Sequence, residues 1–248
     1  MAGHSKYANI KHRKAAQDSK RTKLFSKAAK ELIVAAKGGA DPDGNARLRS
    51  AIIAAKSVNL PRERIEYAIK KGSGNLEANN YEEIRYEAYG PAGSAFVIEC
   101  LTDSRNRAAA AVRALFTKNG GSLAENGSVI FMFEHKGVVR FNKSVASDDE
   151  IFEEAVLLGA DSVESDDDLH EIQTEINGYP EIRDSLIAKY GDPVSAAIEW
   201  LAKDNIDIDA SKADTMLKVI DLLEEDDDVQ NFYTNANIPE DEGDKDDE

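Results

Sequence analysis

The spacing of apolar residues changes near residue 76, and this change limits what the chain can fold into. Before it, apolar side chains recur every three or four residues, as on the buried face of a helix. After it, polar and apolar side chains alternate, as in a half-buried strand, beginning with Glu83, Ile84, Arg85 and Tyr86. We therefore expect a multidomain α+β protein that opens with helices and continues with helices and strands together.

Residues 1–75 predict a basic arm followed by an N-terminal three-helix bundle. The arm, residues 1–20, has few large apolar groups. Helices are expected over about 21–37 and 45–58, and from Pro61, a favoured first helical position, to Lys71. The Gly-Ser-Gly-Asn stretch at 72–75 predicts a linker.

The rest of the chain predicts two α+β domains. Strands over 83–88, 95–101 and 129–133, with a helix capped by Asp103, form a ββαβ unit within residues 76–136. Residues 137–202 have the βαββαβ order of a ferredoxin-like sandwich. Its last element, 196–202, has the apolar spacing of either a helix or a strand; the βαββαβ order and the alternation of Ile198 and Trp200 favour a strand.

The C-terminal part of the chain has no partner within residues 137–202. A helix over 211–224 and a strand over 229–234 are therefore expected to pair back with the ββαβ unit. This gives a second domain made of residues 76–136 plus 203–240. The acidic tail, residues 241–248, is expected to be disordered.

Positive and negative charges are segregated along the chain. Residues 1–75 hold 17 Lys and Arg against 6 Asp and Glu, a net charge of +11, whereas the remainder holds 14 against 41, a net charge of −27. A cationic block at one end can bind phosphates while the acidic remainder discourages indiscriminate binding. The alternative is two solvated faces that differ by chance.

The candidate nucleic-acid contacts are cations with a few hydrogen-bonding and aromatic side chains. Lys and Arg bind phosphates by charge, and counterion release drives the association. Tyr7 is placed to stack on a base, Asn9 to contact a base edge or make a local turn, and His12 to bind phosphate or to lie plainly on the surface. The full set is Lys6, Tyr7, Asn9, Lys11, His12, Arg13, Lys14, Lys20, Arg21, Lys23, Lys27, Lys30, Arg47, Arg49, Arg62, Arg64, Arg105 and Arg107.

Residues 137–202 point to a different partner. They hold 16 acidic residues against 4 Lys and Arg, a net charge of −12, and lack the aromatic RNP1 sequence of RNA-recognition domains. We expect this part of the chain to face other proteins, in particular basic protein surfaces.

Enzyme chemistry has little support in the sequence. The four histidines show no metal-ligand spacing, no phosphate-binding glycine loop or nucleophile elbow is present, and Cys100 is the single cysteine. The runs Asp166–Asp168 and Asp226–Asp228 are ordinary solvated loops or, in the alternative, a divalent-cation site of a metal-dependent nuclease. We expect no catalytic residue, no metal and no cofactor.

The sequence indicates a monomer in a reducing cytoplasm. No apolar run approaches the roughly 18 residues that a membrane span needs, and the N-terminus lacks the apolar core of a secretory signal. Because residues 1–30 contain a single acid, Asp18, a mitochondrial presequence remains an alternative.

Long ordered stretches resemble the YebC/PmpR family, strongly to about residue 140 and more loosely beyond. The matching stretches are 1–14 (MAGHSKYANIKHRK), 44–49 (GNARLR), 69–72 (IKKG), 86–91 (YEAYGP), 99–107 (ECLTDSRNR) and 118–123 (KNGGSL). Tyr7 departs from the family, which usually has Trp there, and this weakens the stacking role.

The resemblance implies a fold and a function. It implies three domains, a helical one and two α+β ones, with the third inserted in the second. It also implies a cytoplasmic bacterial regulator of gene expression, described across the family as a DNA-binding transcriptional regulator. The alternative is a ribosome-associated translation factor that binds ribosomal or transfer RNA and relieves stalling at proline-rich stretches, because the family includes a mitochondrial translational activator. Arg105 and Arg107 are then secondary contacts, or else form salt bridges near a helix start.

Overall fold

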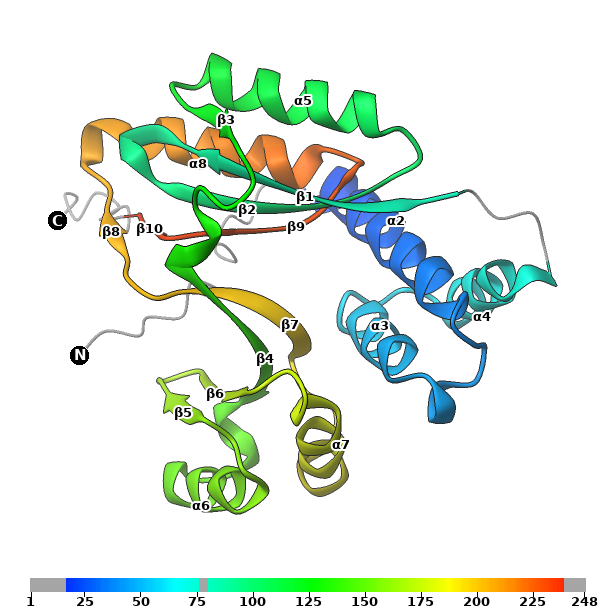
Figure 1. The fold of residues 1–248 in the computed structure, drawn as a ribbon. Coiled ribbons are helices and arrows are strands. Elements are labelled where there is room, and N and C mark those ends of the chain that lie inside the picture. Colours follow the sequence, from blue (N-terminus) through cyan, green and yellow to red (C-terminus); the bar gives the residue numbers. More distant parts are fainter. Residues whose placement is uncertain (1–16, 76–79, 239–248) are drawn as a thin grey trace, which may run out of the picture. The chain divides into compact units, whose positions relative to one another are not determined.

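The computed structural model describes residues 17–75 and 80–238. These residues form two compact units: residues 18–82 with 135–201, and residues 83–134 with the chain from residue 202 onward (Figure 1). The protein is thus a mixed α+β molecule with antiparallel strand pairing, as the change of apolar spacing predicts.

Three helices share one hydrophobic core in the first part of the chain. They are α2 (Gln17–Ala36), α3 (Ala46–Ser57) and α4 (Arg62–Lys70), and their core contains Leu32, Leu48 and Ile65. Asn45 joins two of them: its side chain accepts a hydrogen bond from the Leu48 N–H at 3.0 Å and donates to the carbonyls of Ala35 and Gly39 at 2.8 Å. The three predicted helices are confirmed, although Pro61 caps α4 rather than lying inside it.

The segment after α4 differs from the predicted linker. Residues Lys71–Asn75 continue as a π-helical turn, and Gly72 is buried. A Cβ atom at Gly72 would lie 2.1 Å from the carbonyl oxygen of Ile33 on α2. The glycine is therefore required by close helix packing, and predicting a linker from position 72 was wrong.

The unit formed by residues 83–134 and 202 onward is built on a four-stranded sheet with the order β3-β1-β2-β9. Helices α5 (Arg105–Lys118) and α8 (Ala210–Glu225) lie over one face of this sheet (Figure 1), and Phe96, Phe116 and Met216 are in their shared core. The strands are β1 (Glu82–Tyr89), β2 (Ala95–Thr102), β3 (Ser122–Ala124) and β9 (Val229–Thr234).

The C-terminal strand pairs as the sequence predicts. Strand β9 lies antiparallel to β2, with Val97 opposite Tyr233. Two short strands that the sequence did not suggest, β8 (Ile206–Asp207) and β10 (Ala236–Asn237), pair in parallel.

Two predicted features of this unit are wrong. The predicted strand 129–133 is a 3-10 turn, Ile130–Met132, because the buried Glu87 carboxylate accepts the backbone N–H groups of Gly127, Val129 and Ile130 and so occupies the donors that a strand would use. Ser104, rather than Asp103, stands before α5, and its side chain makes no cap hydrogen bond.

The second α+β part has its helices on one face of its sheet. Its elements are β4 (Phe133–Asn142), α6 (Asp148–Leu158), β5 (Ser162–Ser165), β6 (Leu169–Thr174), α7 (Tyr179–Tyr190) and β7 (Ser195–Ala202), with strand order β5-β6-β4-β7. Val139, Phe141 and Ile172 pack with Ile151 of α6 and Leu186 of α7. The predicted strand at 196–202 is confirmed.

Helices α3 and α7 belong to one unit and are joined by a buried arginine. Arg183 is fully buried, and its guanidinium donates to the Ser50 hydroxyl and to the Ala46 carbonyl of α3. Asp184 binds the same guanidinium at 2.7 Å. Burying an arginine is tolerable only with such partners, so α3 and α7 supply a matched polar contact.

Candidate nucleic-acid interface

Helices α2 and α4 bring two arginines onto one aromatic ring. The guanidinium carbon of Arg21 lies 5.3 Å from the centroid of the Phe25 ring, and that of Arg64 lies 5.8 Å from it. Phe25 packs at the edge of the helical core, and both arginines are exposed. Cation–π contacts at such distances hold a guanidinium in place without neutralising it, so two positive charges meet where the two helices approach.

A second set of cations lies on another side of α2. Lys23, Lys27 and Lys30 follow each other at helical spacing, and the 100° rotation per residue places them on the face opposite Leu32, which is buried in the core. Lys30 is further positioned by its contact with the ring of Tyr81, at 5.6 Å. Residues 21–30 of α2 therefore carry positive charge on two sides. We call these two sets the arginine pair and the lysine stripe.

Arg62 and Arg47 are exposed but have carboxylate partners. Arg62 binds Glu66 at 2.7 Å with its side chain 91% exposed, and this hydrogen bond raises the pKa of Arg62 further. Arg47 binds Glu31 at 2.9 Å and is 45% exposed. Exposed pairs of this kind contribute only about 0–1 kcal/mol, so a phosphate can displace either carboxylate.

Arg49 and Arg107 serve the fold. Arg49 donates to the carbonyls of Pro42 and Asp43 at 2.6 and 2.9 Å, and its Nε lies 3.2 Å from Asp184. Arg107 binds the buried Asp228 at 2.7 Å and Asp103 at 2.9 Å, and the hydrogen bond to Asp228 is the largest cause of its raised pKa. Both guanidinium groups are already paired with carboxylates of the fold, so neither belongs to the proposed contact set.

Of the remaining candidates, only Arg105 has a described side chain. Arg105 is exposed at the start of α5, in the other unit. The arm candidates lie outside the described residues, and Lys20 lies in α2 without a described side chain. The candidates concerned are Lys6, Tyr7, Asn9, Lys11, His12, Arg13, Lys14 and Lys20.

The structure adds one aromatic residue that the sequence reasoning missed. Tyr67 on α4 is 60% exposed, with Arg64 three residues before it and Lys71 four residues after it, each one helical turn away. An exposed ring between cations is the arrangement that stacks on unpaired bases. The exposure of Tyr67 could have been predicted from the sequence, since position 67 lies outside the apolar stripe formed by Ile65, Ala68 and Ile69.

The first carboxylate of each acidic run makes a turn. Asp166 accepts the backbone N–H groups of Asp168 and Leu169 at 2.8 and 2.7 Å, and Asp226 accepts that of Asp228 at 2.8 Å. Over residues 17–75 and 80–238, no group of three or more His, Cys, Asp or Glu side chains is arranged to hold a metal ion. In the same ranges, no helix combines the length and apolarity needed to cross a bilayer.

The chain is similar to known proteins along most of its length. A family model described as the TACO1/YebC protein N-terminal domain matches residues 5–75, and one described as the TACO1/YebC second and third domain, named Transcrip_reg, matches residues 81–236. The crystal structure of a conserved hypothetical protein from Aquifex aeolicus is similar with a TM-score of 0.83 and 41% identity, over 95% of this chain and 98% of that chain.

Proposed function

Since the chain belongs to the TACO1/YebC family, we propose that it is a non-enzymatic, nucleic-acid-binding regulator of gene expression that acts on DNA as a transcriptional regulator. The observation that carries the proposal is the meeting of Arg21 and Arg64 on Phe25 in the cationic part of a chain whose remainder has a net charge of −27. The family model named Transcrip_reg supports the same reading.

We further propose how the domains share this role. Residues 1–75 form a three-helix domain that binds phosphate, residues 76–136 plus 203–240 form the second domain, and residues 137–202 form an inserted ferredoxin-like domain. The strand order β5-β6-β4-β7 with α6 and α7 supports the last assignment. With a net charge of −12, the inserted domain repels phosphate and leaves the helical domain as the binding part.

Salt dependence of duplex DNA binding tests the proposal. If about five phosphates are contacted, log K against log salt should have a slope near −4.5, because each neutralised phosphate contributes about −0.9. Replacing the arginine pair (Arg21→Ala with Arg64→Ala), or two residues of the lysine stripe (Lys23→Ala with Lys27→Ala), should flatten the slope by about 1.8. The measurement is a fluorescence-anisotropy titration at several salt concentrations.

The matched control removes two exposed cations from α5, Arg113→Ala with Lys118→Ala, and should leave the slope unchanged. Replacing the arm residues Lys11, Arg13 and Lys14 by alanine should flatten it by roughly 2–3. If the arginine-pair variant, the lysine-stripe variant and the arm variant all leave the slope unchanged, the cationic third of the chain is not the interface.

The same variants discriminate DNA from the ribosome as the target. Co-sedimentation with ribosomes is compared with promoter-DNA binding at one moderate salt concentration. A transcriptional regulator should stay bound to promoter DNA at a salt concentration at which it dissociates from ribosomes. If instead the protein stays bound to ribosomes at a salt concentration at which it dissociates from promoter DNA, and the arginine-pair variant loses this ribosome binding, the result would support the translation factor.

Tyr67 should separate single-stranded from duplex binding. Tyr67→Ala is expected to weaken binding of a single-stranded oligonucleotide by about 1–3 kcal/mol, the usual value of one stacked base, while a fully paired duplex is affected little. Tyr67→Phe keeps the ring and should bind as the unaltered protein does. Because Tyr67 is 60% exposed, thermal unfolding should be nearly the same in all three proteins. An equal loss for both nucleic acids would exclude stacking by Tyr67.

A further inference from the structure

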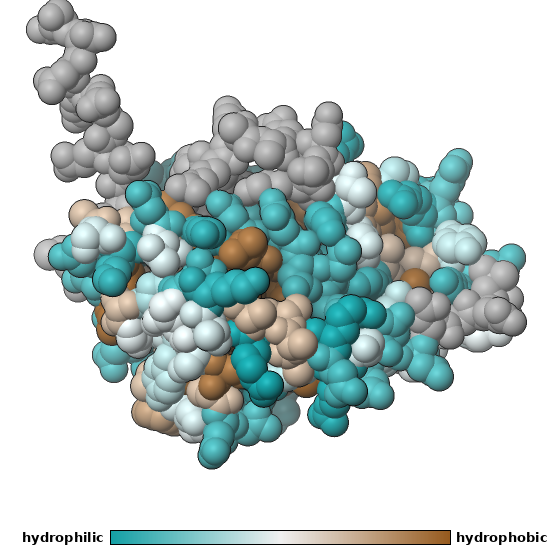
Figure 2. Space-filling view, turned by 90° about the horizontal axis from the view of Figure 1, so that it is seen from above, coloured by the Kyte–Doolittle hydropathy of each residue, from teal (hydrophilic) through white to brown (hydrophobic). Residues whose placement is uncertain are grey.

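Helix α6 exposes large apolar side chains on its outer face. Phe152 and Val156 are each 53% exposed and Leu157 is 82% exposed, whereas Ile151 and Ala155 on the inner face are fully buried. Single exposed apolar residues are normal on proteins, but three within two helical turns form a patch of the kind that marks an interaction site. Apolar residues also reach the surface between hydrophilic ones on the face seen from above in Figure 2, where α6 is not marked.

Two carboxylates divide this apolar face. With 100° per residue, Asp149 and Glu153 fall between the row formed by Phe152 and Val156 and the position of Leu157. Both carboxylates are exposed, and neither forms an ion pair with the described residues. The neighbouring Glu150, in contrast, is held by Ser147 in a capping box.

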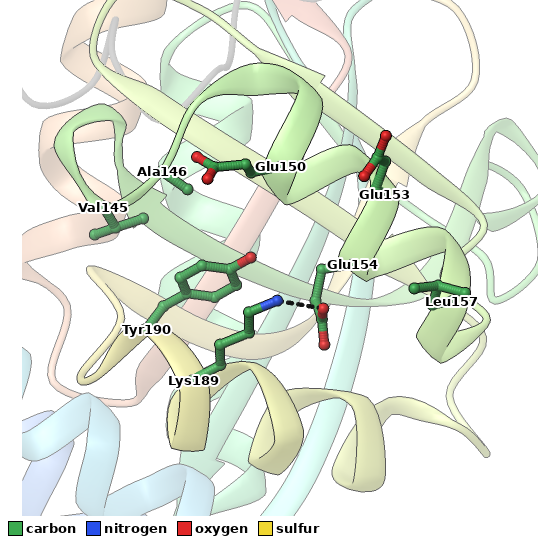
Figure 3. Close-up of a pocket in the computed structure, with 8 residues that line it drawn as sticks. All are labelled: Val145, Ala146, Glu150, Glu153, Glu154, Leu157, Lys189 and Tyr190. Atoms are coloured by element: carbon green, nitrogen blue, oxygen red, sulfur yellow. Dashed lines mark hydrogen bonds and ion pairs between the residues drawn. The ribbon is translucent and has the colours of Figure 1, made fainter.

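A pocket continues the surface toward α7. Leu157, Glu153 and Glu154 line it from α6, and Lys189 and Tyr190 line it from α7 (Figure 3). Lys189 is paired with Glu154, so the positive charge in the pocket is already matched and the carboxylate of Glu153 is not. A cationic side chain that binds here would therefore contact the Glu153 carboxylate next to the apolar side chain of Leu157.

The charge decides between possible occupants. Nucleic acid and anionic lipid would meet unpaired carboxylates in a region of net charge −12. A second copy related by a twofold axis would bring the same carboxylates against each other. A segment with Lys or Arg between apolar side chains matches both features, because each cation meets Asp149 or Glu153 while its neighbours cover the exposed apolar groups.

We propose that the outer face of α6, made of Asp149, Phe152, Glu153, Val156 and Leu157, is a docking surface for a cationic amphipathic segment of a partner protein. This surface does not depend on the proposed nucleic-acid binding. The two activities use different helices, so each can be removed while the other remains.

Peptide binding to the full chain tests the docking surface. The probe is a fluorescent helical peptide of Leu and Lys at amphipathic spacing, and the reference probes are a scrambled peptide of equal charge and a peptide with Glu in place of Lys. The first should bind at least tenfold more tightly than either reference. Phe152→Asp with Leu157→Asp should reduce its affinity at least tenfold. Asp149→Asn with Glu153→Gln should reduce it and remove most of its salt dependence.

Matched controls lie in the other unit. Phe131→Asp changes an apolar residue that is 61% exposed, and Asp214→Asn changes an exposed carboxylate of α8; both should leave peptide binding unchanged. All variants alter exposed side chains, and circular dichroism checks that they fold. The proposal would be overturned if the scrambled peptide bound equally well, or if the α6 variants did not alter peptide binding. It would also be overturned if sedimentation showed a dimer that Leu157→Asp abolishes, or if the protein bound phosphatidylserine vesicles through α6.

Discussion

Replacing Arg140 by alanine is expected to destabilise the protein by about 3–5 kcal/mol, the usual cost of removing one partner from a buried ion pair. Arg140 is 5% exposed on β4, and its guanidinium binds Glu171 of β6 at 2.6 Å and Glu199 of β7 at 2.7 Å. Burial works to lower the pKa of Arg140, but Glu199 and Glu171 outweigh it and raise that pKa. Without the guanidinium, two largely buried carboxylates lose their shared counter-charge.

Urea unfolding followed by circular dichroism measures the loss, and Arg105→Ala is the matched control. Arg105 is exposed, so its replacement should change the free energy of unfolding by no more than about 0.5 kcal/mol.

The cause of the loss can be separated from simple cavity formation. Replacing all three residues together, Arg140→Met, Glu171→Leu and Glu199→Leu, should restore most of the stability, because apolar side chains of similar volume often substitute for a buried ion pair at no net cost. If the triple variant is as unstable as Arg140→Ala in urea at neutral pH, the charge imbalance is not the reason for the loss.

Local sequence was enough to predict most helices and strands. Apolar spacing predicted α2, α3, α6 and the alternating strand β1. The absence of a local partner correctly predicted that β9 returns to the ββαβ unit, where it pairs with β2. These elements follow from short-range pattern and capping chemistry, such as the Ser147 capping box of α6 and Gly159 at its end.

The buried charges could not be predicted in this way. In sequence, Arg140 and Glu87 are polar residues alternating with apolar ones, which is also the pattern of a solvent-facing strand side. Their partners lie far along the chain: Glu199 is 59 residues from Arg140, and Val129 is 42 residues from Glu87. The same distance in sequence hid the role of Arg49, whose carboxylate partner Asp184 lies on α7. For Arg107 the alternative of a salt bridge near the helix start was right, since it binds Asp103, although its second partner Asp228 is far along the chain.

The apolar run at 129–133 shows how one such charge changes local structure. Its residues, Val-Ile-Phe-Met-Phe, have strong strand propensity. The Glu87 carboxylate nevertheless accepts the N–H groups of Gly127, Val129 and Ile130, at 2.8, 2.8 and 3.0 Å, and a 3-10 turn results. A tertiary hydrogen-bond acceptor here outweighs propensity, and this suggests a decisive experiment on Glu87.

Glu87→Ala is expected to lower the free energy of unfolding by about 2–4 kcal/mol, because buried N–H donors left without an acceptor cost about 1–3 kcal/mol each and part of this loss is recovered by water. Glu87 is fully buried. The matched control is Glu82→Ala, an exposed glutamate of the same strand, which should have little effect. Urea unfolding at neutral pH gives both values, and hydrogen exchange at Val129 should accelerate in Glu87→Ala alone.

The pH dependence identifies the ionised carboxylate as the stabilising group. Burial works to raise the pKa of Glu87, but the N–H donors of Gly127, Val129 and Ile130, aided by Arg85, outweigh it and hold that pKa below its ordinary value. A depressed folded-state pKa means that the stabilisation is complete above the unfolded-state pKa and is lost as the pH falls through the folded-state pKa. The difference in stability between the unaltered protein and Glu87→Ala should therefore be constant near neutral pH and should narrow in acid, below about pH 4.5. A difference that stays constant into that acid range would show that Glu87 acts by filling space rather than by accepting hydrogen bonds as an anion.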